Sequence, residues 1–352
     1  MKRIYLIIYL ALLGCVCLSS CTEQLDINRT NNTISLRAEV ENVMPATRSG
    51  SYAEPVADNN ITATVWFSTV PGMFPDGTDT DNPKDESTNI PGHYVINFEG
   101  EKAVFPNVAN ENQRPRYPIP DENKNVKDVY CVGFYPSTDW AYVEGTGSNP
   151  SKATHIITGF EDLMFAPPIQ GNWNDHFDRQ KFLHVLTWLK VCVCATTTEA
   201  GNYWGKLKRI TLKNVPSKLQ INDLSKIQSQ YKGTNEKLIL TNGDVSSVGD
   251  NFSPNIFINN DGIVLGTNIQ DIGSIFCYPQ SSYTLEIECE NGTTKDISIE
   301  LKALSASTIN FPAGFQYLLT LYFHPFNVVE GVCTLNAWDA QNEDLYPDAN
   351  AQ

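Results

Sequence analysis

Residues 34–41 alternate strictly between apolar and polar side chains, which is the pattern of a β-strand with one buried face. The apolar positions are Ile34, Leu36, Ala38 and Val40. The same period of two returns in residues 285–290 and 296–301, where the alternate positions are acidic or carry a hydroxyl. These three stretches therefore predict three strands that each cover one side of a core.

Further strand-like stretches fill most of the remaining chain, at residues 61–68, 94–98, 129–135, 183–195, 207–214, 315–323 and 332–338. Turn sequences such as Asn242-Gly243-Asp244 and Glu290-Asn291-Gly292 lie between them. A helical period is found only at Leu224, Ile227 and Tyr231, which is enough for one short helix. Many short strands with regular turns predict an all-β sandwich architecture.

Two long polar stretches, residues 71–91 and 107–125, interrupt the first half and are predicted to be surface loops. Residues 167–175, rich in Pro and Asn, are the best candidate for a linker, because the strand pattern starts again at Phe182. We therefore expect two β-sandwich domains, at residues 31–178 and residues 179–352.

Residues 1–20 have the composition of an export signal, with Lys2 and Arg3 followed by an uncharged apolar run. The run is too short for a membrane-spanning helix, which needs about twenty apolar residues. Leu18-Ser19-Ser20-Cys21 resembles the bacterial lipobox, in which the cysteine thiol receives a lipid. Cys15 is a poorer alternative, because cleavage there would leave apolar residues in the mature chain, and an ordinary secretory signal is the other alternative.

The segment after Cys21, residues 21–30, is polar and unpatterned and is predicted to be a lipidated, flexible tether. Removal of Lys2 and Arg3 with the signal changes the formal net charge from −15 to 23 − 40 = −17. A field of this sign repels nucleic acids and anionic lipids, so neither is expected as a partner.

Six more cysteines stay in the mature chain, and all lie in strand-like apolar stretches rather than at turns. We expect them to be mostly free, buried thiols, although pairings cannot be derived from spacing. They are Cys131, Cys192, Cys194, Cys277, Cys289 and Cys333.

Common catalytic and metal-binding motifs are missing from the sequence, which contains no His-Glu-x-x-His, Cys-x-x-Cys or Gly-x-Ser-x-Gly. The nearest approach to a metal site is Asp175, His176 and Asp178 with His184, and its spacing matches no established ligand set. The acidic residues in 76–86 lack the order of an EF-hand loop. We expect no enzyme activity, no cofactor and no metal.

Three tryptophans, Trp140, Trp173 and Trp204, fall in or near predicted turns, whereas Trp66 and Trp188 fall within strands. Aromatic faces with one polar end can stack on sugar rings. Trp140 and Trp173 are therefore candidate glycan contacts, although packing between loops is the commoner role of such large side chains.

A series of short motifs follows the first strand in a characteristic order. The series is Pro45-Ala46-Thr47-Arg48-Ser49-Gly50, Val132-Gly133-Phe134-Tyr135-Pro136, Asp162-Leu163-Met164-Phe165-Ala166, Phe182-x-His184-x-Leu186-x-x-Leu189, Tyr278-Pro279-Gln280-Ser281 and Phe311-Pro312-Ala313-Gly314-Phe315-Gln316-Tyr317, with a last strand ending at Trp338. This order resembles the fimbrillin family, the lipoprotein precursors of type V pili, over nearly the whole mature chain. Each motif is weak alone, and the specificity lies in their order.

The resemblance implies two transthyretin-like β-sandwich domains in tandem and assembly by donor-strand exchange into a pilus (fimbrium). A lipid on Cys21 would carry the precursor to the outer membrane at the cell surface. An arginine-specific protease would cut after Arg48, and residues 34–41 would leave a groove that a strand from another pilus subunit fills. Arg29 and Arg37 are rival cleavage points. Residues 328–338 would be part of the donated region.

The sequence leaves several roles open. The tail after Trp338 is acidic and shows little alternation, which puts its use as a donor strand in doubt. A subunit that accepts but does not donate would be a tip, and one that keeps its lipid and first strand would be a membrane-retained anchor. A surface glycan-binding lipoprotein is the alternative from another class, and a secreted hydrolase is disfavoured by the missing motifs.

Overall fold

The structure is a computed structural model of the chain, and it describes residues 33–40, 60–74, 93–99, 102–104, 114–143, 145, 149–231, 238, 240, 243–300 and 314–336. The chain divides into two compact units, Met1–Thr33 and Ile34–Gln352. All strands given below belong to the second unit, and the expected all-β fold is confirmed. Across the described ranges no helix has the length and apolar character needed to span a membrane.

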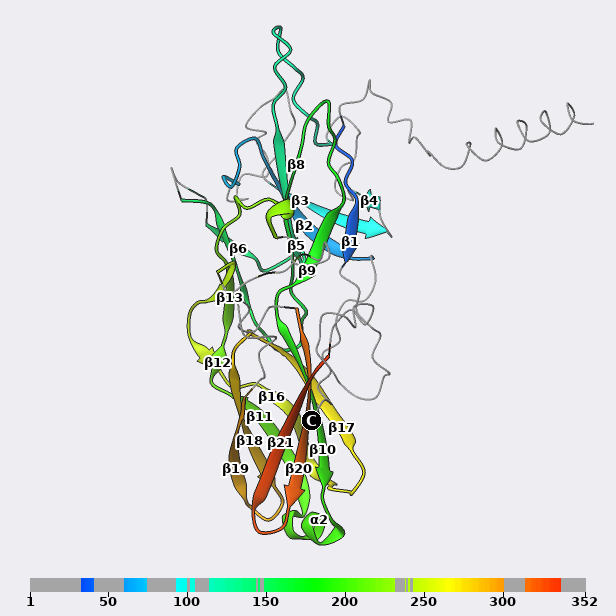
Figure 1. The fold of residues 1–352 in the computed structure, drawn as a ribbon, viewed down its shortest axis with the longest axis vertical. Coiled ribbons are helices and arrows are strands. Elements are labelled where there is room, and N and C mark those ends of the chain that lie inside the picture. The colour runs from blue at the N-terminus through cyan, green and yellow to red at the C-terminus, as the bar shows by residue number, and fades with distance from the viewer. Residues whose placement is uncertain are drawn as a thin grey trace, which may run out of the picture. The chain divides into compact units, whose positions relative to one another are not determined.

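A seven-stranded sheet organises the first half of the second unit (Figure 1). Neighbouring strands are antiparallel except for β1 and β9, which run parallel. In spatial order the strands are β1 (Ala38–Val40), β9 (Gln180–His184), β8 (Met164–Gly171), β5 (Val129–Tyr135), β2 (Thr62–Ser68), β3 (His93–Glu99) and β4 (Lys102–Val104).

The central strands of this sheet, β2, β5 and β8, are buried on both faces, which explains why their sequences are nearly continuously apolar. On β5, Val129 and Cys131 belong to one core, whereas Val132 and Phe134 belong to another. The first of these contains the apolar side chains of residues 34–40 and is called the β1 core. The second lies under the strand β7 and is called the β7 core.

The β7 core is covered by a four-stranded sheet whose order is β14-β13-β7-β6. It combines β6 (Ala141–Val143) and β7 (Lys152–Ile156) with β13 (Lys218–Ile221) and β14 (Val245–Ser247). A two-stranded pair, β12 (Val215–Pro216) and β15 (Asn251–Phe252), lies next to these in sequence. Residues 180–184 and 218–221 thus pair with strands of the first half, while the expected domain limit near residue 178 stays a prediction.

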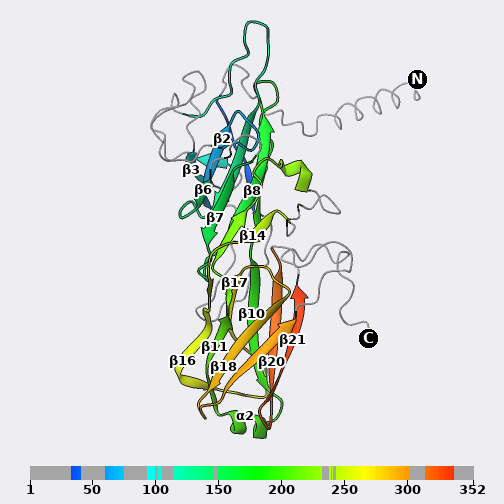
Figure 2. The same ribbon diagram turned by 90° about the vertical axis from the view of Figure 1, so that its left-hand side faces the viewer.

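Two further four-stranded sheets enclose the C-terminal core (Figure 2). One has the order β17-β10-β20-β21, and the other has the order β16-β11-β18-β19. Their strands are β10 (Thr187–Ala195), β11 (Lys206–Lys213), β16 (Asn255–Val264), β17 (Gln270–Cys277), β18 (Ser282–Cys289), β19 (Thr294–Glu300), β20 (Gln316–His324) and β21 (Val328–Asn336). As the sequence predicted, β18 and β19 bury every second side chain.

Helical structure is short in the described part of the chain. Helix α2 (Thr198–Trp204) joins β10 to β11, and the Thr197 hydroxyl caps it by accepting a hydrogen bond from the Ala200 amide at 3.1 Å. The expected helix around Leu224 and Tyr231 is a single 3-10 turn, η2 (Gln228–Tyr231). The sequence did not predict α2.

The prediction that residues 167–175 form a linker is wrong, because β8 runs through Pro167 and Pro168 in the middle of the seven-stranded sheet. Proline has no amide hydrogen to donate to a neighbouring strand. The pairing of β8 with β5 shifts at this point, since Cys131 faces Ile169 while Gly133 faces Ala166. The irregular register tolerates the two prolines within a central strand.

The single strand expected at residues 183–195 is two strands in two different sheets. β9 ends at His184, and β10 begins at Thr187. The residues between them, Val185 and Leu186, are completely buried, so apolar character continues while the chain passes from one sheet to the next. A continuous apolar sequence does not mark such a crossing.

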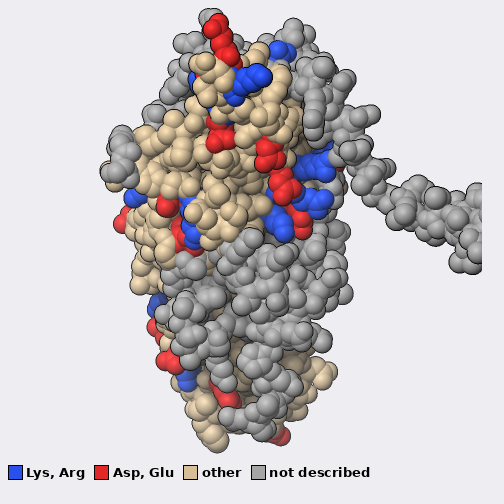
Figure 3. Space-filling model, turned by 45° about the horizontal axis from the view of Figure 1, so that its top comes forward, with Lys and Arg blue, Asp and Glu red and all other residues tan. Residues whose placement is uncertain are grey.

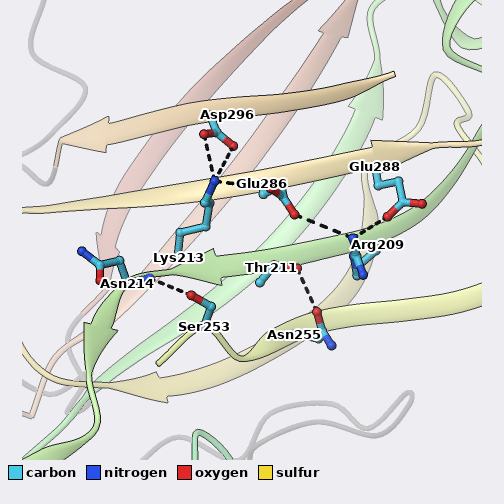
Figure 4. Close-up of polar contacts among 9 residues, drawn as sticks. All are labelled: Arg209, Thr211, Lys213, Asn214, Ser253, Asn255, Glu286, Glu288 and Asp296. Atoms are coloured by element: carbon cyan, nitrogen blue, oxygen red, sulfur yellow. Dashed lines mark hydrogen bonds and ion pairs between the residues drawn. The ribbon is translucent and has the colours of Figure 1, made fainter. Parts of the chain in front are cut away.

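Charged side chains cover the outer face of the β11 and β18 sheet (Figure 4). Arg209 lies 2.6 Å from Glu288 and 3.7 Å from Glu286. Lys213 bridges Glu286 at 3.3 Å and Asp296 at 3.0 Å, and these partners raise the pKa of Lys213. Basic and acidic side chains are also neighbours on the face drawn in Figure 3, so the acidic excess does not form a single patch on that face.

Mutations on the two faces of β18 should lower the free energy of unfolding by very different amounts. Ile287→Ala removes a completely buried side chain from the C-terminal core and should lower the free energy of unfolding by about 2–5 kcal/mol. Glu286→Gln, one residue away, breaks two solvent-exposed ion pairs and should lower it much less. Chemical denaturation of both variants measures the difference, and equal losses would contradict this account of the sheet.

Candidate functional site

Residues 34–40 form the most unusual element of the structure, because they close the seven-stranded sheet. On one side, β1 pairs in parallel with β9 at three successive positions, and the Gln180 amide donates to the Arg37 carbonyl at 2.9 Å. On the other side, the Ala103 amide of β4 donates to the Leu36 carbonyl at 3.2 Å. The backbones of Arg37 and Lys102 form an isolated antiparallel β-bridge there. Figure 1 draws β1 beside β4. One short segment thus joins the two edges of the sheet.

The side chains of this segment follow the alternation seen in the sequence. The exposed fractions are 1% for Ile34, 2% for Leu36, 0% for Ala38 and 3% for Val40. Between them, Ser35 and Arg37 are exposed and Glu39 is half-buried. All four apolar side chains enter the β1 core, so the predicted strand and its buried face are confirmed.

The groove that receives these side chains is apolar and is lined from several strands of the sheet. Its wall includes Val65, Ile96, Phe98, Cys131, Met164 and Phe182, all with 1% exposure or less. Phe98 and Phe182 meet edge to face, with 5.6 Å between ring centroids. Without residues 34–40, this wall would face water, and the backbone groups of β9 and β4 that they satisfy would lose their partners.

Polar contacts also fix the position of β1. A guanidinium nitrogen of Arg179 lies 3.2 Å from the Glu39 carboxylate, and both side chains are about one third exposed. Gln180 is completely buried, and its carboxamide donates to the Cys131 carbonyl at 3.2 Å. The ion pair favours an acidic residue at this position of the strand, since solvent-exposed pairs add specificity more than stability.

The reactivity of the Cys131 thiol depends on whether the β1 core is intact. It is completely buried and donates a weak hydrogen bond to Gln180 Oε1 at 3.8 Å. Burial raises the pKa of Cys131 well above its ordinary value. Because the thiolate is the reactive form, Cys131 should be inert in the intact fold.

The main processing residues proposed from sequence lie outside the described residues. These are Cys21, Arg48 and the rival Arg29, together with signal residues 1–20. Lipidation and cleavage therefore stay predictions. The other rival, Arg37, is exposed, but its carbonyl is hydrogen-bonded to β9, which makes its peptide bond a poor protease substrate.

The two candidate glycan contacts are half-buried and pack against different cores. Trp140 packs between Phe134 and His155, with centroid distances of 4.8 and 4.9 Å, next to the β7 core. Trp173 packs against the β1 core. The structure does not bring them into one cluster, so no common aromatic platform forms from this pair.

The weak metal cluster of the sequence is also separated in space. His184 lies 2.8 Å from Asp162 with both side chains buried, and His176 packs on Tyr117 with 4.9 Å between ring centroids. Within the ranges that the structure describes, no three His, Cys, Asp or Glu side chains are placed to hold a metal ion. All six cysteines from Cys131 onward are free, as expected.

Sequence reasoning missed the parts of the site that come from distant segments. Arg179, Gln180 and β4 carried no recognisable motif, because backbone pairing to a short edge strand leaves almost no trace in side-chain pattern. A parallel neighbour such as β9 is especially difficult to predict, because it is far away in sequence. Arg179, which directly precedes β9, is 140 positions from its partner Glu39.

Comparison with known proteins finds distant structural neighbours. No protein-family model matches the chain, and no curated protein does. A "putative cell adhesion protein" of Bacteroides uniformis is 14% identical, with a TM-score of 0.49, and the alignment covers 88% of this chain and 100% of that one. A protein of the same description from Bacteroides ovatus is 15% identical, with a TM-score of 0.47. The alignment covers 88% of this chain and 99% of that one.

A fimbrial protein from Bacteroides vulgatus is 11% identical, with a TM-score of 0.44, and the alignment covers 87% of this chain and 99% of that one. These neighbours are thus named as adhesion and fimbrial proteins. At such identities and TM-scores, the likeness is too distant to assign a mechanism or a partner.

The β1 core predicts a specific response of Cys131. Leu36→Asp places a carboxylate in the apolar groove and should expel residues 34–40, so that a thiol reagent modifies Cys131 in the folded protein. Ser35→Asp is the matched control, because Ser35 is exposed, and it should leave Cys131 unreactive.

Mass spectrometry of the labelled cysteines measures this effect site by site. Cys277, which lies in the C-terminal core and whose pKa burial raises to about 12, should stay unlabelled in both variants. Equal labelling of Cys131 in the two variants would contradict the assignment of residues 34–40 as the lid of this core.

Proposed function

We propose that the protein is a structural or adhesive subunit of a cell-surface pilus, exported as a lipoprotein precursor and assembled by protease-triggered donor-strand exchange. One observation carries the proposal: residues 34–40 fill an apolar groove and close the sheet, yet they lie at the N-terminal end of the unit. A segment so placed can be removed by a single cut that leaves the rest of the unit covalently intact.

The position of Arg48 fits such a cut. It follows the last residue of β1, Val40, by only eight residues, and no other arginine lies between them. Cleavage there would separate Cys21 and its lipid from the body of the protein together with β1. The competing site within the strand, Arg37, has a backbone engaged by β9.

The vacated groove defines what could replace β1. A replacement strand must offer apolar side chains at every second position and backbone groups that pair with β9 and β4. This is a strand from another subunit in the proposed assembly, which makes the chain's partners further copies or related pilus subunits. In this proposal the two halves of the second unit serve as tandem transthyretin-like sandwiches.

The terminal strand β21 is the best candidate for the donated segment. It lies at the edge of its sheet and pairs only with β20 among the described strands. Its side chains from Val328 to Thr334 are all exposed or half-buried, in contrast to the four buried side chains of residues 34–40. Detachment of β21 would break nine positions of pairing with β20 and the partial packing of Val329 and Cys333, but it would expose no fully buried side chain from Val328 to Thr334.

The anchor role differs from the stalk and tip roles in one step. An anchor keeps Cys21, its lipid and β1, so it offers no open groove. The groove, the segment that fills it and the adjacent Arg48 favour the processed subunit, because an anchor has no need of an arginine at that position.

Treatment of the purified full chain with an arginine-specific protease tests the proposal. We expect a product that starts at Ser49, followed by a ladder of denaturant-resistant polymers on a gel, because open grooves capture strands from neighbouring molecules. Arg48→Gln should stay monomeric at every dose, and Arg29→Gln is the control that should polymerise like the wild type. Cleavage at Arg48 that leaves only monomers would refute the stalk role.

A further inference from the structure

Gln228, in the short 3-10 turn η2, makes two hydrogen bonds to the backbone of β9. Its carboxamide nitrogen donates to the Arg179 carbonyl at 3.1 Å, and its carboxamide oxygen accepts from the Lys181 amide at 2.9 Å. A neighbouring strand would satisfy the same two groups. The side chain therefore takes the place of a strand along this part of β9.

The two sides of β9 have different partners at this point. Backbone groups of successive residues in a strand point to opposite edges. The Gln180 amide bonds to Arg37 of the β1 segment, whereas the groups of Arg179 and Lys181 bond to Gln228. Pairing with β8 begins only at Leu183. Between Arg179 and Phe182, β9 is therefore held by the β1 segment on one side and by Gln228 on the other.

The turn that carries Gln228 is itself firmly anchored. Tyr231 is 2% exposed in the β7 core, and its ring meets Phe165 of β8 edge to face at 6.2 Å. The Lys226 ammonium lies 4.0 Å from the centre of the Tyr231 ring and 2.8 Å from the Asp244 carboxylate. The turn thus holds Gln228 through contacts that do not involve β1.

We propose that Gln228 is a positioning residue that keeps β9 extended as an acceptor edge after β1 has left, and this rests on the strand exchange proposed above. A segment that loses the strand beside it gains conformational freedom and must be ordered again by the incoming strand. The carboxamide removes part of that ordering penalty, because it still fixes Arg179 and Lys181 when the β1 side is empty.

Binding of a fluorescent peptide with the sequence of residues 33–41 to the protease-treated full chain tests this role. Gln228→Leu removes both hydrogen bonds and should weaken peptide binding about tenfold or more relative to the wild type. Gln230→Leu is the matched control, because Gln230 lies in the same turn and its side chain accepts a hydrogen bond from the Ile227 amide within that turn. It should bind like the wild type.

Gln228→Glu separates positioning from general stability. An ionised carboxylate can accept from Lys181 but cannot donate to the Arg179 carbonyl, so binding should be weak at neutral pH. A protonated carboxyl regains a donor, so binding relative to the wild type should recover as the pH falls through about 4.3, the ordinary pKa of glutamate. Loss of stability alone would give no such recovery.

The outcomes distinguish this inference from the proposed function. Peptide uptake that is equal in the wild type and in Gln228→Leu overturns the role of Gln228 and leaves strand exchange standing. A wild type that after cleavage neither takes up the peptide nor forms polymers overturns strand exchange and the role of Gln228 together. If Gln228→Leu fails to fold, the pH recovery of Gln228→Glu decides: recovery supports the positioning role, and its absence refutes it.

Discussion

The structure depends on burial of both faces of the central strands of one sheet, and burial of the face toward the β1 core requires residues 34–40. A sheet with a core on each side cannot leave an edge open beside its apolar wall, because unpaired backbone groups would then lie next to apolar side chains. The β1 segment satisfies β9 and β4 at once and adds Ile34, Leu36, Ala38 and Val40 to the core. The same segment therefore closes the sheet and fills the β1 core.

Magnitudes show how much the fold relies on this segment. Burial of Ile34, Leu36 and Val40 contributes about 5–9 kcal/mol as an upper estimate, at about 1.5–3 kcal/mol for each large apolar side chain. Whole domains are stable by only about 5–15 kcal/mol. Loss of the segment without replacement would therefore remove a large share of the stability. The same numbers provide a driving force for any strand that can take its place.

The sequence predicted those elements whose fold is set by local pattern. Alternation identified residues 34–40, β18 and β19, because each buries one face. It failed where the tertiary structure decides. Two prolines made the sequence of β8 look like a linker. Val185 and Leu186 are buried between β9 and β10, so the two strands were predicted as one. The site was predictable only as far as β1 itself, since β4 pairs with it through backbone groups that any residue carries, and Gln228 reaches the backbone of Arg179 and Lys181 from a distant turn.

The contrast between β1 and β21 would give the proposed strand exchange a direction. β1 buries four side chains in alternation, while β21 buries none from Val328 to Thr334. Yet residues 329, 331, 333 and 335 are Val, Gly, Cys and Leu, an alternating set with small residues at its centre, as Ala38 is in β1. The tail after Trp338 offers no comparable alternation. In the proposed exchange, donation from the C-terminal end would therefore require β21 to give up nine positions of pairing with β20 and the packing of Val329 and Cys333, in return for a groove that buries a whole apolar face.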